Sequence, residues 1–164
     1  EKQFIDIFKH IEMYNNPTKK VGNMGQIGEL AVKRVFSEHG IDFLKCPFKE
    51  SVRPDGYIEM GSDKYIVEVK SRTYTGSGTA SEKIDCIARK LHVFYKKYGC
   101  KSIVIFTAGQ IYEKSGDAFL NNDNEYVEKF KAFAKNTSGV EYWLSFNELE
   151  HWIKSKQVVS LSTC

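Results

Sequence analysis

The sequence has few cysteines, and none of them is arranged as a zinc site. Its four cysteines, Cys46, Cys86, Cys100 and Cys164, form no Cys-x-x-Cys pair and no cluster with histidine. Structural zinc requires clusters of this kind. We therefore expect no zinc centre, and we expect the thiols to be reduced in an intracellular protein, because disulfides are rare there.

The sequence also lacks membrane and targeting signals. No apolar run approaches membrane-spanning length, since a transmembrane helix needs about 20 consecutive apolar residues. The N-terminus shows no secretory signal pattern, and the chain contains no internal repeat or low-complexity segment. These absences exclude a membrane-spanning class and favour a cytoplasmic protein with no membrane partner.

Length and composition are those of an ordinary globular protein. The 164 residues are enough for a core of good size, so we expect residues 1–164 to form one domain. Apolar residues make up 41% and charged residues 27% of the chain, which is usual for a folded protein. The net charge of +3 is compatible with a polyanionic partner but does not identify one.

One predicted hairpin concentrates the polar chemistry of the chain. Arg-Pro-Asp-Gly at 53–56 precedes a first strand, and a Gly-Ser-Asp turn leads to Tyr-Ile-Val-Glu-Val-Lys at 65–70. Side chains alternate along a strand, so Glu68 and Lys70 share one face. Asp55 starts the partner strand. An in-register hairpin therefore brings two carboxylates and one ammonium to the same end of the sheet.

This grouping suits metal-assisted phosphodiester chemistry. Mg²⁺ prefers oxygen ligands, usually one or two carboxylates with waters and substrate phosphate. A bound metal polarises the phosphodiester and acidifies a bound water, and a nearby lysine orients the water or balances transition-state charge. The alternative is a surface hairpin with a Glu–Lys pair on its polar face. That alternative is weakened because Glu68 interrupts an apolar run typical of a buried strand, where a carboxylate needs a partner or a metal.

The spacing of these residues resembles a known motif. Pro-Asp at 54–55, a gap of twelve residues and Glu-Val-Lys at 68–70 are similar to the motif of the PD-(D/E)xK nuclease superfamily. That group holds many restriction endonucleases, junction resolvases and repair nucleases. The resemblance covers residues 22–108. It implies cleavage of DNA that depends on Mg²⁺, for which Mn²⁺ can substitute. It also implies that the products carry 5′-phosphate ends.

The resemblance also implies roles for individual residues. It assigns Asp55 and Glu68 to the metal, with the carbonyl of Val69 as a further ligand, and Lys70 to the attacking water. An acidic residue on the first core helix often completes such a site, and Glu29 matches that placement. The alternative for Glu29 is a solvent-facing residue favoured by the first turn of a helix.

The remaining pattern predicts an α/β fold. Apolar spacing predicts helices at 2–14, 23–39, 79–98, 125–135 and 146–153, and strands at 41–44, 101–108 and 140–144. With the hairpin this makes a mixed sheet of four to five strands with helices on both faces, in the order α-β-β-β-α-β. The residues expected to face the core are Ile27, Leu30, Ala31, Arg34, Val35 and Phe36 in one helix and Tyr126, Val127, Phe130 and Phe133 in another.

Two basic residues near the hairpin are candidates for DNA contact. Arg72 follows the second strand and precedes a polar, glycine-containing loop, and Lys83 lies near the start of the next helix. A helix N-terminus with a nearby lysine is an anion site. Thr79 and Glu82 have the spacing of a capping box, which is a structural role and does not exclude binding.

The function favoured by the sequence is a type II restriction endonuclease acting on double-stranded DNA. A structure-specific resolvase or repair nuclease is an alternative within the same chemistry. A DNA-binding module with a vestigial site is a second alternative, which the complete set of Asp55, Glu68 and Lys70 disfavours. An α/β domain without nuclease activity is the third. A homodimer is expected if the target site is palindromic.

Overall fold

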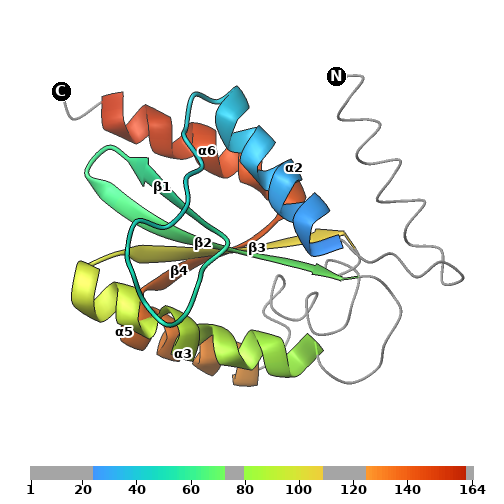
Figure 1. Ribbon diagram of the computed structural model, residues 1–164, viewed down its shortest axis with the longest axis vertical. Helices are drawn as coiled ribbons and strands as arrows, with labels where there is room; N and C mark the ends of the chain where they lie inside the picture. The colour runs from blue at the N-terminus through green and yellow to red at the C-terminus, as the bar shows by residue number, and fades with distance from the viewer. Residues whose placement is uncertain (1–23, 73–79, 109–124, 162–164) are drawn as a thin grey trace, which may run out of the picture.

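Residues 24–72, 80–108 and 125–161 are described by a computed structural model, in which a four-stranded sheet carries helices on both faces (Figure 1). The described helices are α2 (Met24–Glu38), α3 (Ala80–Tyr98), α5 (Glu125–Ser138) and α6 (Phe146–Leu161). The strands are β1 (Gly56–Met60), β2 (Asp63–Arg72), β3 (Lys101–Ala108) and β4 (Val140–Ser145). The predicted α/β fold is confirmed.

The sheet is mixed and runs in the order β1-β2-β3-β4. Strands β1 and β2 form the predicted antiparallel hairpin, closed by a tight turn between Met60 and Asp63 in which Gly61 has a φ of 62°. A positive φ of this size favours glycine, which has no Cβ to clash. Strand β3 is parallel to β2, as the α3 crossover predicts, and β4 is parallel to β3 at the sheet edge.

Two hydrophobic cores cover the two faces of the sheet. Figure 1 shows α2 and α6 over one face and α3 and α5 over the other. Along β2, Tyr65, Val67 and Val69 enter the core under α2 and α6, whereas Ile66 enters the core under α3 and α5. This alternation places Glu68 on the α3 side, in a strand buried on both faces. Burial of a carboxylate there requires compensation.

The segment predicted as a strand at 41–44 makes only one β-bridge. Leu44 exchanges two backbone hydrogen bonds of 2.9 Å with Tyr57, and no ladder extends from that pair in the described residues. Pro47, soon after the bridge, has no N–H to continue a ladder. The first strand of the expected α-β-β-β order is therefore reduced to a single contact with β1.

Three helical predictions need correction. Leu30, Tyr126 and Phe133, expected in the core, have exposed fractions of 62%, 60% and 56%. The buried face of each helix lies to one side of the face that was expected. The buried residues are Ala31, Val32, Val35 and Phe36 in α2 and Val127 and Ala134 in α5. Helix α6 continues to Leu161 and does not end at residue 153. The predicted helix at 2–14 and the side chains of Thr79 and Glu82 lie outside the described residues.

Helix α2 contacts the sheet closely through Gly28. A Cβ added at Gly28 would lie 2.0 Å from Ser71 Oγ and 2.7 Å from Thr107 Oγ1. These two hydroxyl oxygens are 2.5 Å apart and hydrogen-bonded to each other across β2 and β3. The absence of a side chain at Gly28 thus brings α2 onto the carboxyl ends of both strands, with Glu29 as the next residue.

We expect Gly28→Ala to destabilise the protein by up to about 2 kcal/mol. Alanine gains about 1 kcal/mol over glycine inside a helix, but overpacking at a closed contact costs about 1–3 kcal/mol. Gly25→Ala is the matched control, because nothing lies within 4 Å of its added Cβ, and it should be neutral or stabilising. Chemical denaturation of both variants tests this, and a Gly28→Ala protein as stable as Gly25→Ala would contradict the close packing.

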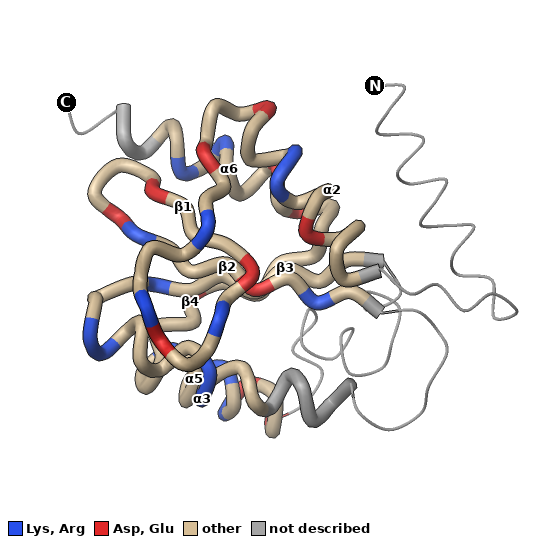
Figure 2. The backbone as a smooth tube through the Cα atoms, in the orientation of Figure 1, with Lys and Arg blue, Asp and Glu red and all other residues tan. Residues whose placement is uncertain are grey.

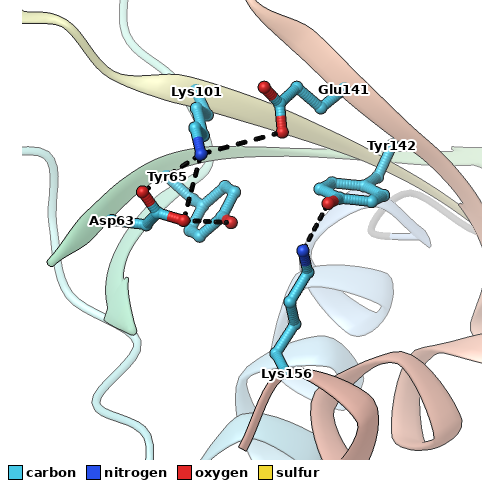
Figure 3. Close-up of polar contacts among 6 residues, drawn as sticks. All are labelled: Asp63, Tyr65, Lys101, Glu141, Tyr142 and Lys156. Atoms are coloured by element: carbon cyan, nitrogen blue, oxygen red, sulfur yellow. Dashed lines mark hydrogen bonds and ion pairs between the residues drawn. The ribbon is translucent and has the colours of Figure 1, made fainter. Parts of the chain in front are cut away.

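A polar cluster joins the strands at the end of the sheet where β2 and β3 begin. Figure 3 shows Lys101 between Asp63 and Glu141, and Lys156 on the ring hydroxyl of Tyr142. Lys101 Nζ lies 3.0 Å from both carboxylate oxygens of Asp63 and 4.0 Å from Glu141. This ammonium holds the pKa of Asp63 below its usual range. The charges at this end of the sheet therefore stabilise the fold.

None of the helices in the described ranges is long and apolar enough to cross a membrane.

Candidate active site

The hairpin brings Asp55 to the strand that carries Glu68 and Lys70, as predicted. Asp55 immediately precedes β1, and the β1–β2 register pairs the next residue, Gly56, with Val67. The N–H of Val69 donates a hydrogen bond of 2.7 Å to Asp55 Oδ2. Asp55 is thereby fixed beside the carboxyl-terminal half of β2, near the edge where parallel strands of α/β sheets commonly present their ligand sites.

Glu68 is a buried carboxylate held between two ammonium groups. Its side chain is 0% exposed. Lys70 Nζ donates a hydrogen bond of 2.7 Å to Oε2, and Lys90 Nζ from α3 lies 2.5 Å from Oε1. The Lys90 contact is an ion pair without hydrogen-bond geometry, because Glu68 Oε1 is buried and has no hydrogen-bond partner. One oxygen of the central carboxylate is therefore compensated by the charge of Lys90 but accepts no hydrogen bond.

Lys90 is the residue that sequence reasoning missed. It follows Ile87 by three residues and precedes Phe94 by four, and both of these are buried. Helical residues at these spacings lie on one face. A lysine beside the apolar stripe of α3 was the available signal, since a charged residue there needs a partner on the sheet.

The pKa values of two carboxylates near β2, Asp55 and Glu29, are raised above their ordinary values. Burial raises the pKa of Asp55, and repulsion by Glu68 raises it further, against the hydrogen bond from Val69. The pKa of Glu29 is raised by burial and then by the charges of Asp55 and Glu68. Glu29 is therefore close enough to Asp55 and Glu68 for their charges to affect its pKa, and its role at the site stays a prediction.

The charge of the site is close to balance without a metal. When all groups are ionised, the carboxylates of Glu29, Asp55 and Glu68 face the ammonium groups of Lys70 and Lys90, which leaves one net negative charge. In Figure 2 acidic segments lie near the centre of the molecule with a basic segment close by. Perturbed titration at a cluster of this kind is typical of functional sites.

The donor set fits a hard divalent cation. Among the residues that the structure describes, no group of three or more His, Cys, Asp or Glu side chains is arranged to hold a metal. Mg²⁺ does not need one, because it binds through one or two carboxylates and keeps several waters. Asp55 and Glu68 supply two carboxylates, and the Val69 carbonyl supplies a further oxygen. The fully buried Glu68 carboxylate, whose Oε1 accepts no hydrogen bond and is compensated by the partly exposed Lys90, supports this fit.

The two predicted DNA-contacting residues are placed only by their backbones. Arg72 ends β2, and Lys83 lies near the start of α3. Their side chains lie outside the described residues, so their contacts with DNA stay predictions. Of the cysteines, Cys46, Cys86 and Cys100 are free thiols, and Cys164 lies outside the described ranges.

No protein-family model and no curated protein matches the chain. Among solved structures, the chain is similar to the restriction endonuclease FokI. The two share 17% sequence identity with a TM-score of 0.49, over 97% of this chain and 28% of the FokI chain. This chain thus spans less than a third of the length of that enzyme. A likeness at this level does not establish a shared activity.

Proposed function

We propose that this protein is a metal-dependent endodeoxyribonuclease that hydrolyses phosphodiester bonds of DNA. The observation that carries the proposal is the fully buried Glu68 carboxylate, which lies beside Asp55 and between the ammonium groups of Lys70 and Lys90. A fold gains nothing in stability from burying a carboxylate that repels its neighbour, so such a group points to function.

Each residue of the site has a distinct role in the proposed reaction. Asp55, Glu68 and the Val69 carbonyl hold Mg²⁺ or Mn²⁺. A bound metal supplies polarisation of the phosphate and acidification of water. Lys70 is 21% exposed and donates a hydrogen bond to Glu68, and it orients the attacking water. Glu29 orders water at the metal or adds a ligand to it.

The reaction conserves atoms and charge in a single displacement. The water oxygen forms a bond to phosphorus while the bond from phosphorus to the 3′-oxygen breaks. The water gives up a proton and the 3′-oxygen takes one up, so the products carry a 5′-phosphate and a 3′-hydroxyl. Lys70 balances the charge that develops on the phosphate oxygens in the transition state.

Within this class we propose a type II restriction endonuclease acting on double-stranded DNA. Arg72 and Lys83 contact backbone phosphates, where they position the duplex without reading its sequence. A palindromic target would require a homodimer, since two-fold DNA sites match two-fold proteins. A resolvase or repair nuclease with the same catalytic groups is the competing assignment, and the two differ in substrate and not in chemistry.

Cleavage should require a divalent metal. Mixed plasmid and phage DNA incubated with the protein should be cut in Mg²⁺ or Mn²⁺ and left intact in EDTA, because Asp55 and Glu68 are adjacent anions that act through a cation. Gel electrophoresis measures the loss of intact DNA, and restoring Mg²⁺ after EDTA is the control. Full cleavage in EDTA would remove the metal from the proposal.

The ends of the fragments identify the kind of nuclease. Sequencing of the ends should give discrete sites for a restriction endonuclease and scattered sites for a nonspecific one. Preference for a four-way junction or a flap over linear duplex, at equal protein concentration, would assign the chain to the resolvase or repair class. Binding without cleavage of any of these DNAs, under every metal condition, would leave only a DNA-binding module.

A further inference from the structure

Lys90 occupies the position at which a cation is needed when no metal is bound. Its ammonium lies 2.5 Å from Glu68 Oε1, the oxygen that lacks a hydrogen bond. Lys70 already donates a hydrogen bond to the other oxygen. A buried carboxylate without compensation is strongly destabilising, and the contact with Lys90 supplies a second positive charge at short range.

Two features indicate that Lys90 is able to leave this position. Its side chain is 28% exposed, so one side of it reaches solvent. Its contact with Glu68 lacks hydrogen-bond geometry, unlike that of Lys70. A long lysine stem can also stay packed while its head moves. Departure of the Lys90 head would free an oxygen of Glu68 without breaking the hydrogen bond from Lys70.

The charges predict what happens when metal and DNA arrive. Three carboxylates and two ammonium groups give one net negative charge. A divalent cation would reverse this to one net positive charge. Lys90 would then be repelled from the metal-bearing carboxylate, and an anionic phosphate would restore neutrality.

We propose that Lys90 is a metal-released phosphate clamp: it pairs with Glu68 in the metal-free protein and moves to a DNA phosphate when metal binds. The proposal rests on the nuclease function proposed above. It assigns to α3 a residue that couples metal binding to DNA binding. Lys70, by contrast, stays beside Glu68 in both states.

Amine labelling of the unmodified protein tests the movement directly. Lysines are modified with a small acylating reagent, and the sites are quantified by mass spectrometry with EDTA, with Ca²⁺, and with Ca²⁺ plus duplex DNA. Labelling of Lys90 should rise several-fold with Ca²⁺ and fall again with DNA. Lys96, an exposed residue of the same helix, is the internal control and should not follow Ca²⁺. Labelling of Lys90 that does not respond to Ca²⁺ would overturn the proposal.

A variant tests the energetic consequence. Lys90→Met keeps the apolar stem and removes the competing charge, so Mn²⁺ binding measured by calorimetry without DNA should tighten by about tenfold. DNA affinity in Ca²⁺ should weaken, and the salt dependence of binding should become shallower by about 0.9 in the log–log slope, the value for one phosphate contact. Lys96→Met is the matched control.

The outcomes separate this inference from the proposed function. Suppose that the wild-type protein binds Mn²⁺ and cleaves DNA, and that Lys90→Met matches Lys96→Met in Mn²⁺ affinity and in salt slope. This result would overturn only the role of Lys90. Wild-type protein that shows no Mn²⁺ binding by calorimetry would overturn the metal site itself, and the clamp with it. If Lys90→Met fails to fold, the labelling of the wild-type protein decides the proposal.

Discussion

Lys70→Ala should reduce the cleavage rate by a factor of about a hundred to a thousand, the usual effect of removing one transition-state donor. Lys70 is the ammonium that hydrogen-bonds Glu68 and still reaches solvent. A charged lysine cannot be a metal ligand, so its contribution is to the attacking water or to a nonbridging phosphate oxygen. DNA affinity measured in Ca²⁺, which replaces Mg²⁺, should change little.

Separate measurements of binding and cleavage distinguish this role from a structural one. Single-turnover rates with saturating protein isolate the chemical step, and thermal unfolding shows whether the variant is folded. Lys64→Ala is the matched control, because Lys64 is an exposed residue of the same strand. A Lys70→Ala protein that cleaves as fast as Lys64→Ala would return the Glu68–Lys70 pair to the polar face of an ordinary hairpin.

The β1–β2 hairpin was predictable because its signals are local. Alternation along residues 65–70 fixed which side chains share a face, and the turn at Gly61 fixed the register that puts Asp55 next to Val69. A shift of one residue would have reversed every side chain of the strand. Glu68 interrupting an apolar run gave the strongest hint of function, and the structure confirms its full burial.

The partner of Lys90 was not predictable, because the position of Lys90 beside the apolar stripe of α3 indicates only that it needs a partner, and tertiary packing decides which one. Lys90 contacts Glu68 only when α3 packs on the sheet, and the number of residues between them in the sequence does not indicate the contact. The exposed side chains of Leu30 and Tyr126 have a similar cause. Helical spacing identifies a face to within about one residue in a turn, whereas packing against a neighbour decides which edge of that face is buried.

The two ends of the sheet use charge in opposite ways. At the beginning of β2, Asp63 is paired with Lys101 and its pKa is lowered, so its ionised form stabilises the folded state. Next to the carboxyl-terminal half of the same strand, the pKa of Asp55 is raised by burial and by Glu68. Ionised Asp55 therefore costs stability in the metal-free protein. Active sites whose preformed arrangement of charges lowers the stability of the folded protein are common in enzymes.

This contrast predicts opposite effects of two matched substitutions. Asp55→Asn should have the same or a higher free energy of unfolding than the wild type in EDTA at neutral pH, since asparagine still accepts the N–H of Val69 and removes a disfavoured charge. The folded pKa of Asp55 lies above its ordinary value of 3.8. The favourable contribution of Asp55 to the free energy of unfolding is therefore present below the ordinary pKa and is lost as the pH rises through the folded pKa. The advantage of Asp55→Asn should grow over that interval and then level off.

Asp63→Asn is the control of opposite sign. The folded pKa of Asp63 is lowered by Lys101. The contribution of Asp63 to the free energy of unfolding is therefore present above its ordinary pKa and is lost as the pH falls through the folded pKa. Asp63→Asn should thus be less stable than the wild type at neutral pH, and the difference should shrink in acid. Urea unfolding of the three proteins across this pH range in EDTA measures both differences.

Metal should reverse the order of stability at Asp55. A ligand that binds only the folded state at a hundred times its dissociation constant stabilises by about 2.7 kcal/mol. The wild type should gain this from Mn²⁺, and Asp63→Asn should gain the same. Asp55→Asn should gain far less and should lose cleavage, because one of the two carboxylates proposed to bind the metal is gone. If Asp55→Asn is less stable than the wild type in EDTA and gains as much from Mn²⁺, Asp55 serves only to hold the Val69 N–H, and the metal site lies elsewhere.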